Sequence, residues 1–276
     1  MATLRAIRRR IKSIKNISQV TRAMEMVAAS KMRRAQLATV ASRAYSEKAR
    51  EVLSFVSDQP GSGRVLHPLL EERRQVKNIA VILIAGDRGL CGSYNANIYR
   101  AAMAFMREKK LPTKLITIGR RARDFAVRRS MNLIGEFTGF SERPTFTQIG
   151  PIARIVIEEF TSGKVDEVYI AYTDFFNVIR QSPTVRRILP VRSEKRADAA
   201  EKSRAVYLYE PDPETLLASV LPRFTEVQIY QAVLESVASE HSARMVAMRN
   251  ASDNAHELID SLTLEANKAR QTAITK

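Results

Sequence analysis

The chain is 276 residues long, carries a formal net charge of +16, and contains 45% hydrophobic residues and one cysteine. No apolar run approaches the ~18 residues of a membrane-spanning helix, and a single cysteine excludes an internal disulfide and fits a reducing compartment. The hydrophobic fraction is sufficient for the core of one or two domains. The positive charge predicts an acidic partner: nucleic acid, anionic lipid or acidic protein.

The N-terminal segment is predicted to form one long basic helix. Residues 3–56 contain neither glycine nor proline, and residues 1–57 carry 13 Lys or Arg against 3 Asp or Glu. Apolar residues recur every three or four positions, as in a helix packed on another helix. The predicted contact positions are Leu4, Ile7, Ile11, Ile14, Ile17, Val20 or Thr21, Met24 and Val27. Because the periodicity begins at Leu4, the basic start is predicted to be mature sequence and not a signal or transit peptide.

The middle of the chain alternates between predicted strands and helices. A Gln-Pro-Gly-Ser-Gly linker at 59–63 separates it from the first helix. Apolar, β-branched runs predict strands at 76–85, 114–118, 132–137 and 165–173. Amphipathic runs predict helices at 95–110, 120–129 and 147–161. This alternation is typical of a small α/β layer with a largely parallel sheet.

Two more strands are predicted before the last helix. Residues 184–191 are expected to continue the sheet in antiparallel orientation, and residues 205–210 to form a final strand. Asp212 followed by Pro213 is a helix-start signal, with Asp as the cap and Pro at the first helical position. Pro222 is expected to kink that helix or to separate it from the long helix that follows.

The C-terminal segment, residues 223–276, is predicted to form a second long helix. It contains no glycine or proline, and residues 213–276 carry 6 Lys or Arg against 8 Asp or Glu. The predicted contact positions are Tyr230, Leu234, Val237, His241, Met245, Met248, Ala251, Ala255, Leu258, Leu262 and Ala266. Two long helices at the two ends of a chain must both reach the middle segment, so they are expected to run antiparallel as a rod.

The predicted fold class is therefore α/β with long terminal helices. Residues 1–57 and 212–276 are expected to form an antiparallel coiled coil, and residues 58–211 an inserted Rossmann-like α/β domain.

The Gly-rich turn GDRGLCGS at 86–93 lies between a predicted strand and a predicted helix, where a nucleotide-binding fold would hold phosphate. It matches neither G-x-G-x-x-G nor a G-K-[ST] ending, so no lysine is placed to reach a phosphate. A tight turn at the start of a helix explains the same residues. A further interpretation is that Arg88 is displayed outward for a protein contact.

Catalytic and metal-binding residues are not predicted. Cys91 could act as a nucleophile only with a nearby base, and the three histidines are scattered at His67, His241 and His256. One cysteine and three dispersed histidines cannot supply the ligand spacing of a metal site. We therefore expect no cofactor and no metal.

Nucleic-acid binding is the alternative that the charge leaves open. The chain contains no helix-turn-helix or zinc-finger pattern, and its basic residues lie beside a predicted coiled coil. A bZIP arrangement would place the basic segment before a parallel zipper, whereas here an inserted domain interrupts the chain. We expect no nucleic-acid partner.

Long motifs mark the two ends of the chain and the Gly-rich turn. They are ATLRAIRRRIKSIKNISQVTRAMEMVAASKMRRA, DRGLCGSYN and SEHSARMVAMRNASDNAHELIDSLTLEANKARQTAIT. In these motifs, and over nearly its whole length, the chain resembles the γ subunit of F-type ATP synthases. The resemblance implies a central rotor shaft that couples proton-driven rotation of the c-ring to sequential conformational change of the catalytic β subunits.

The resemblance also implies partners and a location. One copy would lie inside a ring of three α and three β subunits, with the α/β domain as a foot that contacts the ε subunit and the membrane c-ring. Catalysis would belong to β, so the chain would have no active site and no cofactor of its own. It would lie at the cytoplasmic face of the bacterial plasma membrane, peripherally, through the c-ring.

The same motifs imply contact residues for the α/β ring. Arg270 and Gln271 match contacts to a β loop near the upper shaft, and Arg88, Arg33 and Arg34 match positions that face the acidic DELSEED segment of β.

Further implied contacts lie on both long helices and on the foot. A bulky cation at Met24 would be expected to form a wrong ion pair with that acidic segment, and Arg244 matches a polar contact on the C-terminal helix. Tyr207, Tyr209 and Glu210 match the foot, facing ε and the c-ring loops.

Overall fold

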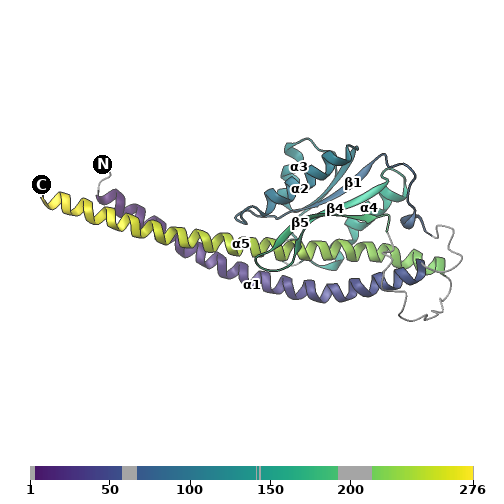
Figure 1. Cartoon of the computed structure of the whole chain (residues 1–276), viewed down its shortest axis with the longest axis horizontal. Coiled ribbons are helices and arrows are strands. Elements are labelled where there is room, and N and C mark those ends of the chain that lie inside the picture. Colours follow the sequence, from purple (N-terminus) through teal and green to yellow (C-terminus); the bar gives the residue numbers. More distant parts are fainter. Residues whose placement is uncertain (1–3, 58–66, 141, 143, 192–212, 276) are drawn as a thin grey trace.

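Two long antiparallel helices dominate the computed structural model and extend as a rod well beyond an α/β body (Figure 1). The structure describes residues 4–57, 67–140, 142, 144–191 and 213–275, with backbone alone at 44–57 and 213–214. Helix α1 (Leu4–Ser57) and helix α5 (Pro213–Thr275) lie side by side, and both chain ends lie at the same end of the rod. The predicted pairing of the terminal helices is confirmed.

The body is built on a five-stranded sheet with the order β3-β2-β1-β4-β5. The strands are β1 (Ile79–Ile84), β2 (Thr113–Ile118), β3 (Leu133–Phe137), β4 (Glu167–Phe175) and β5 (Gln181–Leu189). Strands β1 to β4 pair in parallel, and β5 pairs antiparallel with β4. The largely parallel sheet and its antiparallel continuation are thus confirmed.

Three helices and two short 3-10 turns complete the body. They are α2 (Tyr94–Lys109), α3 (Arg120–Arg128), α4 (Gly150–Thr161), η1 (Pro68–Leu70) and η2 (Phe146–Gln148). Successive side chains of a strand point to opposite faces. Ile79, Val81 and Leu83 of β1 accordingly pack with α2 and α3. Ala80, Ile82 and Ile84 pack in a second cluster that includes α4 and α5.

The contact surface of α1 differs from the predicted one in its middle part. Ile17 and Val27 are 53% and 55% exposed, whereas Ser18 and Ala28 are buried. Of the two residues predicted for one contact position, Thr21 is buried and Val20 is 58% exposed. Repeated steps of three residues rotate around a helix, and a stripe that keeps facing one partner must alternate steps of three and four. The buried positions Ile7, Ser18, Thr21, Ala28, Met32, Ala35 and Thr39 keep that register.

The contact surface of α5 shows a similar shift. Met248, Ala255 and Leu262 are buried as predicted, but Leu258 is 53% exposed. A polar contact fixes the helices against each other, because the Ser18 hydroxyl lies 3.5 Å from the Ser252 hydroxyl and 3.2 Å from His256 Nε2.

Pro222 lies within α5 and does not separate it into two helices, so that part of the expectation was wrong. The loss of one backbone donor is tolerated in a helix whose neighbouring Leu221, Phe224 and Thr225 are buried. The strand predicted at 205–210 lies outside the described residues.

Candidate functional site

The Gly-rich turn after β1 is held in place by its own side chains. Asn95 accepts a hydrogen bond from the Gly86 amide (3.0 Å) and donates one to Cys91 Sγ (3.2 Å). The Asp87 carboxylate accepts hydrogen bonds from the Arg120 amide (3.0 Å) and the Gly139 amide (3.1 Å). The turn therefore ties the carboxyl ends of β1, β2 and β3 together and leads into α2.

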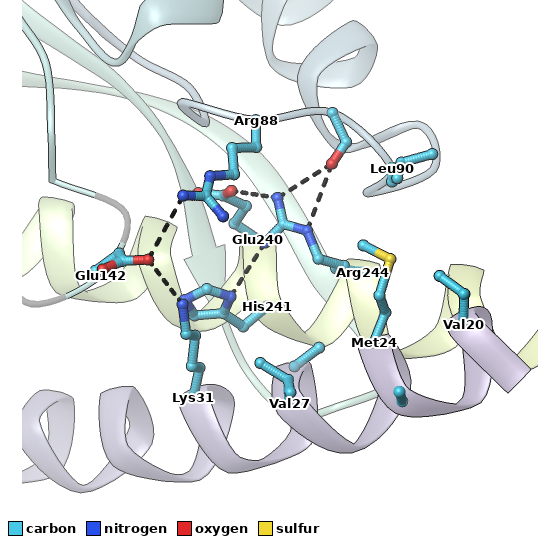
Figure 2. Close-up of a pocket in the computed structure, with 13 residues that line it drawn as sticks. Val20, Met24, Val27, Lys31, Arg88, Leu90, Glu142, Glu240, His241 and Arg244 are labelled. Atoms are coloured by element: carbon cyan, nitrogen blue, oxygen red, sulfur yellow. Dashed lines mark hydrogen bonds and ion pairs between the residues drawn. The ribbon is translucent and has the colours of Figure 1, made fainter.

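Helix α5 brings buried charges against this turn. Glu240 and Arg244 are 2% and 9% exposed, and Arg244 Nη2 donates a 2.5 Å hydrogen bond to Glu240 Oε1. The same guanidinium group donates to the Gly89 carbonyl through Nε (3.4 Å) and Nη2 (3.3 Å), and Nη1 lies 3.1 Å from His241 Nδ1 (Figure 2). A buried ion pair requires such additional hydrogen bonds to offset its desolvation.

A side chain at position 86 would displace the Glu240 carboxylate, which occupies that space. A Cβ atom on Gly86 would lie 2.9 Å from both Cδ and Oε1 of Glu240, closer than real Cβ contacts come. The turn, which occupies the position of a phosphate-binding loop, thus faces a carboxylate of its own chain.

Helix α5 lies where the strand order would place a ligand-binding crevice. In doubly wound sheets, ligands bind outside the carboxyl ends of the strands where the strand order reverses, here between β1 and β4. The Ser236 hydroxyl accepts from the Thr173 amide (3.3 Å), and the Ser239 hydroxyl donates to the Thr173 carbonyl (3.2 Å). Tyr94 donates to the Ser236 carbonyl (3.1 Å). Helix α5 therefore occupies this position, and residues 232–242 are buried throughout.

A cavity of about 430 Å³ opens beside these charges, between α1, α5 and the turn (Figure 2). Its lining includes Val20, Ala23, Met24, Val27, Ala28 and Lys31 of α1, Arg88, Gly89 and Leu90 of the turn, Glu142, and Glu240, His241 and Arg244 of α5. It combines apolar side chains with a charged rim, which is the usual composition of a binding surface.

The rim of the cavity contains two ion pairs that share one carboxylate. Glu142 Oε1 lies 3.0 Å from Lys31 Nζ and 3.8 Å from Arg88 Nη2. The hydrogen bond from Lys31 is the main cause that lowers the pKa of Glu142. Glu142 and Arg88 are solvent-exposed and Lys31 is only partly buried, so each pair contributes little to stability. Arg88, with 79% of its side chain exposed, is available to a partner.

Cys91 is a poor nucleophile in this setting. Burial and the neighbouring Glu240 raise the pKa of its thiol, so the neutral form predominates at neutral pH. Thiol reactivity requires the opposite shift. Within the described residues, no group of three His, Cys, Asp or Glu is placed to hold a metal ion.

The structure brings three of the predicted contact residues together, because Met24, Arg88 and Arg244 line the same cavity. Arg33 and Arg34 are exposed on α1.

The other predicted residues lie elsewhere. Arg270 and Gln271 are exposed near the C-terminal end of α5, on the part of the rod that projects from the body. Tyr207, Tyr209 and Glu210 lie outside the described residues.

Sequence reasoning missed Lys31, Glu142 and Glu240, and it identified Gly86 in the turn without its contact with Glu240. The spacing of four between Glu240 and Arg244 on a helix was an available signal for their pairing. No local signal pointed to Lys31 and Glu142, which are 111 positions apart.

Comparisons with known proteins identify relatives of this chain. A family model described as ATP synthase matches residues 3–276. ATP synthase gamma chains of Dehalococcoides mccartyi (strain 195) and Chloroflexus aurantiacus (strain J-10-fl) are 49% and 47% identical over 275 and 279 residues. Each alignment covers 100% of this chain and 95% of the relative.

Solved structures show the same fold. The rotor of the Euglena gracilis mitochondrial ATP synthase matches with a TM-score of 0.67 at 18% identity, covering 98% of both chains. A central stalk and c-ring structure of the Tetrahymena thermophila mitochondrial ATP synthase matches with a TM-score of 0.65 at 24% identity, covering 84% of this chain and 99% of that one. Among the described residues, no helix is long and apolar enough to cross a membrane. The family match and the full-length identities show that the chain belongs to the ATP synthase γ chain family.

Proposed function

We propose that this chain is the central rotor shaft of an F-type ATP synthase. Residues 1–57 and 212–276 form the shaft, and residues 58–211 form the foot. The chain couples proton-driven rotation of the c-ring to sequential conformational change of the catalytic β subunits. The observation that carries this proposal is the antiparallel α1–α5 rod, which projects beyond the body and has both chain ends at its tip.

The shaft acts through contacts that change as it turns. A conformation of a β subunit is favoured only by a contact whose energy differs between its conformations. The two sides of the rod differ in charge, with 13 Lys or Arg against 3 Asp or Glu in residues 1–57 and 6 against 8 in residues 213–276. Rotation therefore presents a different charge to each β subunit in turn, which supports a stepwise bias.

The proposed contacts to the ring divide along the rod. Arg88, Arg33 and Arg34 face the acidic DELSEED segment of β, and their exposure supports this role. Arg270 and Gln271, also exposed, contact a β loop near the upper shaft. Met24 and Arg244, which line the same cavity, provide further contacts to the α/β ring.

The foot contacts the ε subunit and the c-ring through Tyr207, Tyr209 and Glu210. One copy is present per complex, with three α and three β subunits. The chain lies at the cytoplasmic face of the bacterial plasma membrane and contacts the membrane peripherally, through the c-ring. Catalysis belongs to β, and the filling of the crevice between β1 and β4 by α5 supports a chain without an active site of its own.

Reconstitution tests the proposed function. The chain is mixed with α and β subunits from the same organism, and native mass spectrometry measures the stoichiometry. We expect three α, three β and one copy of this chain, and ATP-driven rotation of a bead attached to the foot. The α and β subunits without this chain are the control. A chain that stays alone, or a complex that hydrolyses ATP without rotation, would overturn the proposal.

A further inference from the structure

We infer that the foot is fixed to α5 and not to α1, through a buried joint formed by Gly86, Gly89, Glu240 and Arg244, here called the Glu240 joint. Rotation of the foot passes into the shaft through this joint. The inference rests on the proposed function, because it assigns the path of torque within the proposed rotor.

The first argument is which helix of the rod meets the sheet. Helix α5 packs against β4, β5, α2 and α4, whereas α1 packs mainly against α5. Among the described residues, the polar links from α1 to the body are peripheral. Lys31 pairs with the 64%-exposed Glu142, and Arg43, with 44% of its side chain exposed, donates to the Phe175 carbonyl (3.2 Å). Exposed pairs resist displacement weakly.

The second argument is the close approach at Gly86. The carboxylate of Glu240 lies where a side chain at position 86 would be, with a Cβ distance of 2.9 Å. The carboxylate fits there only because residue 86 has no Cβ atom, and a packed interior leaves few voids into which it could shift. Sliding or rotation of α5 relative to the turn is therefore resisted at this point.

The third argument is the hydrogen-bond network that connects α5 to the turn. Arg244 connects the Glu240 carboxylate to the Gly89 carbonyl, so a charge-assisted network spans from the helix to the turn. Buried networks of this kind hold one geometry, because a displaced charge loses its partners in a low dielectric.

Serine hydroxyl groups along α5 make further hydrogen bonds to the body. Ser236 and Ser239 pair with both backbone groups of Thr173. One turn further, the Ser242 hydroxyl donates to the Val178 carbonyl (2.8 Å) and accepts from Gln181 Nε2 (3.0 Å). The body thus holds α5 on both sides of Glu240 along the helix, through β4 before it and through the β4–β5 hairpin after it.

The torsional stiffness of the assembled rotor tests this inference. In a complex with α and β, a bead is attached through an encoded azide-bearing residue at exposed Glu108 on α2, and the rotor is stalled. Angular fluctuation of the bead then reports the stiffness between the foot and the held shaft. The variants are Glu240→Ala and Glu240→Gln, in a Cys91→Ser background. Glu257→Ala, an exposed substitution on the same helix, is the matched control.

A disulfide tests whether lost stiffness arises at this joint. A Cβ atom on Gly92 would lie 3.8 Å from Ala247 Cβ, which matches the Cβ separation of about 3.8 Å in disulfides. The pair Gly92→Cys and Ala247→Cys can therefore reconnect the turn to α5 in the Glu240→Ala background. Gly92 has a φ of +56°, which strains a cysteine at this position, and the reduced pair carries the same strain as the oxidised pair. Its reduced form is the internal control.

We expect Glu240→Ala to lower the stiffness at least about two-fold, with a smaller loss for Glu240→Gln and no change for Glu257→Ala. Oxidation of the cysteine pair restores the stiffness, and reduction removes it again. Where Glu240→Ala does not assemble, Glu240→Gln carries the test, because it keeps the shape and removes the charge.

Unchanged stiffness in the assembled variants, or a loss that the oxidised disulfide does not recover, would overturn the inference. A failure of the proposed function is distinguishable, because the wild-type chain would then form no rotating complex at all.

Discussion

Arg244 and Glu240 form a buried ion pair one helical turn apart on α5, and the Arg244 guanidinium also reaches the Gly89 carbonyl of the turn after β1. A contact within one helix is thereby converted into a contact between the rod and the body.

Removal of Glu240 is expected to destabilise the whole chain. In Glu240→Ala the buried Arg244 loses its carboxylate, and breaking one side of a buried pair costs about 3–5 kcal/mol. Urea unfolding followed by circular dichroism measures the loss, with Glu257→Ala as an exposed control expected within about 0.5 kcal/mol of wild type. A loss below that of the control would show that the pair is not buried as described.

A methyl group at Gly86 is expected to act through Glu240. Gly86→Ala places a Cβ against the carboxylate and should cost about 1–3 kcal/mol by overpacking. Gly150→Ala, whose added Cβ would meet an ordinary contact at 3.9 Å, is the matched control. In Gly86→Ala combined with Glu240→Ala, we expect a smaller loss than the sum of the two single changes. Additive losses would contradict a shared contact.

Stability should fall as pH rises towards neutrality because of Glu235. Burial, followed by the neighbouring Asp174 carboxyl group, raises the pKa of Glu235 from 4.5 to about 7, although Gln231 and Arg43 act in the opposite direction. Between these pKa values the unfolded chain releases a proton that the folded chain keeps. The free energy of unfolding therefore decreases with rising pH in this window, by on the order of 2 kcal/mol, and levels off above it.

Urea midpoints between pH 5 and pH 8 measure this dependence. Glu235→Gln keeps a hydrogen-bonding side chain without the titration, so its midpoint should vary less with pH than that of wild type. Glu257→Gln should keep the wild-type slope. Equal slopes for wild type and Glu235→Gln would show that this carboxyl group does not titrate in the window.

A cation at Met24 is expected to impair coupling. Met24 lines the same cavity as Lys31, Arg88 and Arg244, so Met24→Lys adds a charge to a surface that is proposed to face an acidic partner. We expect the ratio of ATP-driven proton pumping to ATP hydrolysis to fall while assembly is kept. Met24→Leu, of similar volume, is the control. A wild-type ratio in Met24→Lys would remove the role given to this residue.

Nucleotide binding by the isolated chain is expected to be weak. The Glu240 carboxylate, paired with Arg244, already occupies the space beside Gly86 that a phosphate would need. Calorimetry should give a dissociation constant for ATP no tighter than about 1 mM, roughly −4 kcal/mol. Micromolar binding would revive the enzyme interpretation of the turn.

Local patterns predicted most of the fold. The apolar run at 76–85 predicted β1 correctly. A strand that is buried on both faces is apolar throughout, and every side chain of Ile79–Ile84 is buried. The absence of glycine and proline predicted the two long helices for a similarly local reason. Part of the α1 contact surface was misassigned because Ile17 and Val27 are apolar yet exposed, and periodicity cannot distinguish a surface that meets a partner helix from one that does not.

The elements, the basic character of α1 and the family resemblance could therefore be read from the amino-acid order. Secondary structure follows from side chains within a few positions of one another, and charge from composition. The filling of the crevice between β1 and β4 by α5, and the contact of Arg244 with Gly89 from 155 positions away, became visible only in the folded chain. The reason is physical: which charges are buried together depends on how distant segments dock, and a glycine's role depends on the group that approaches it.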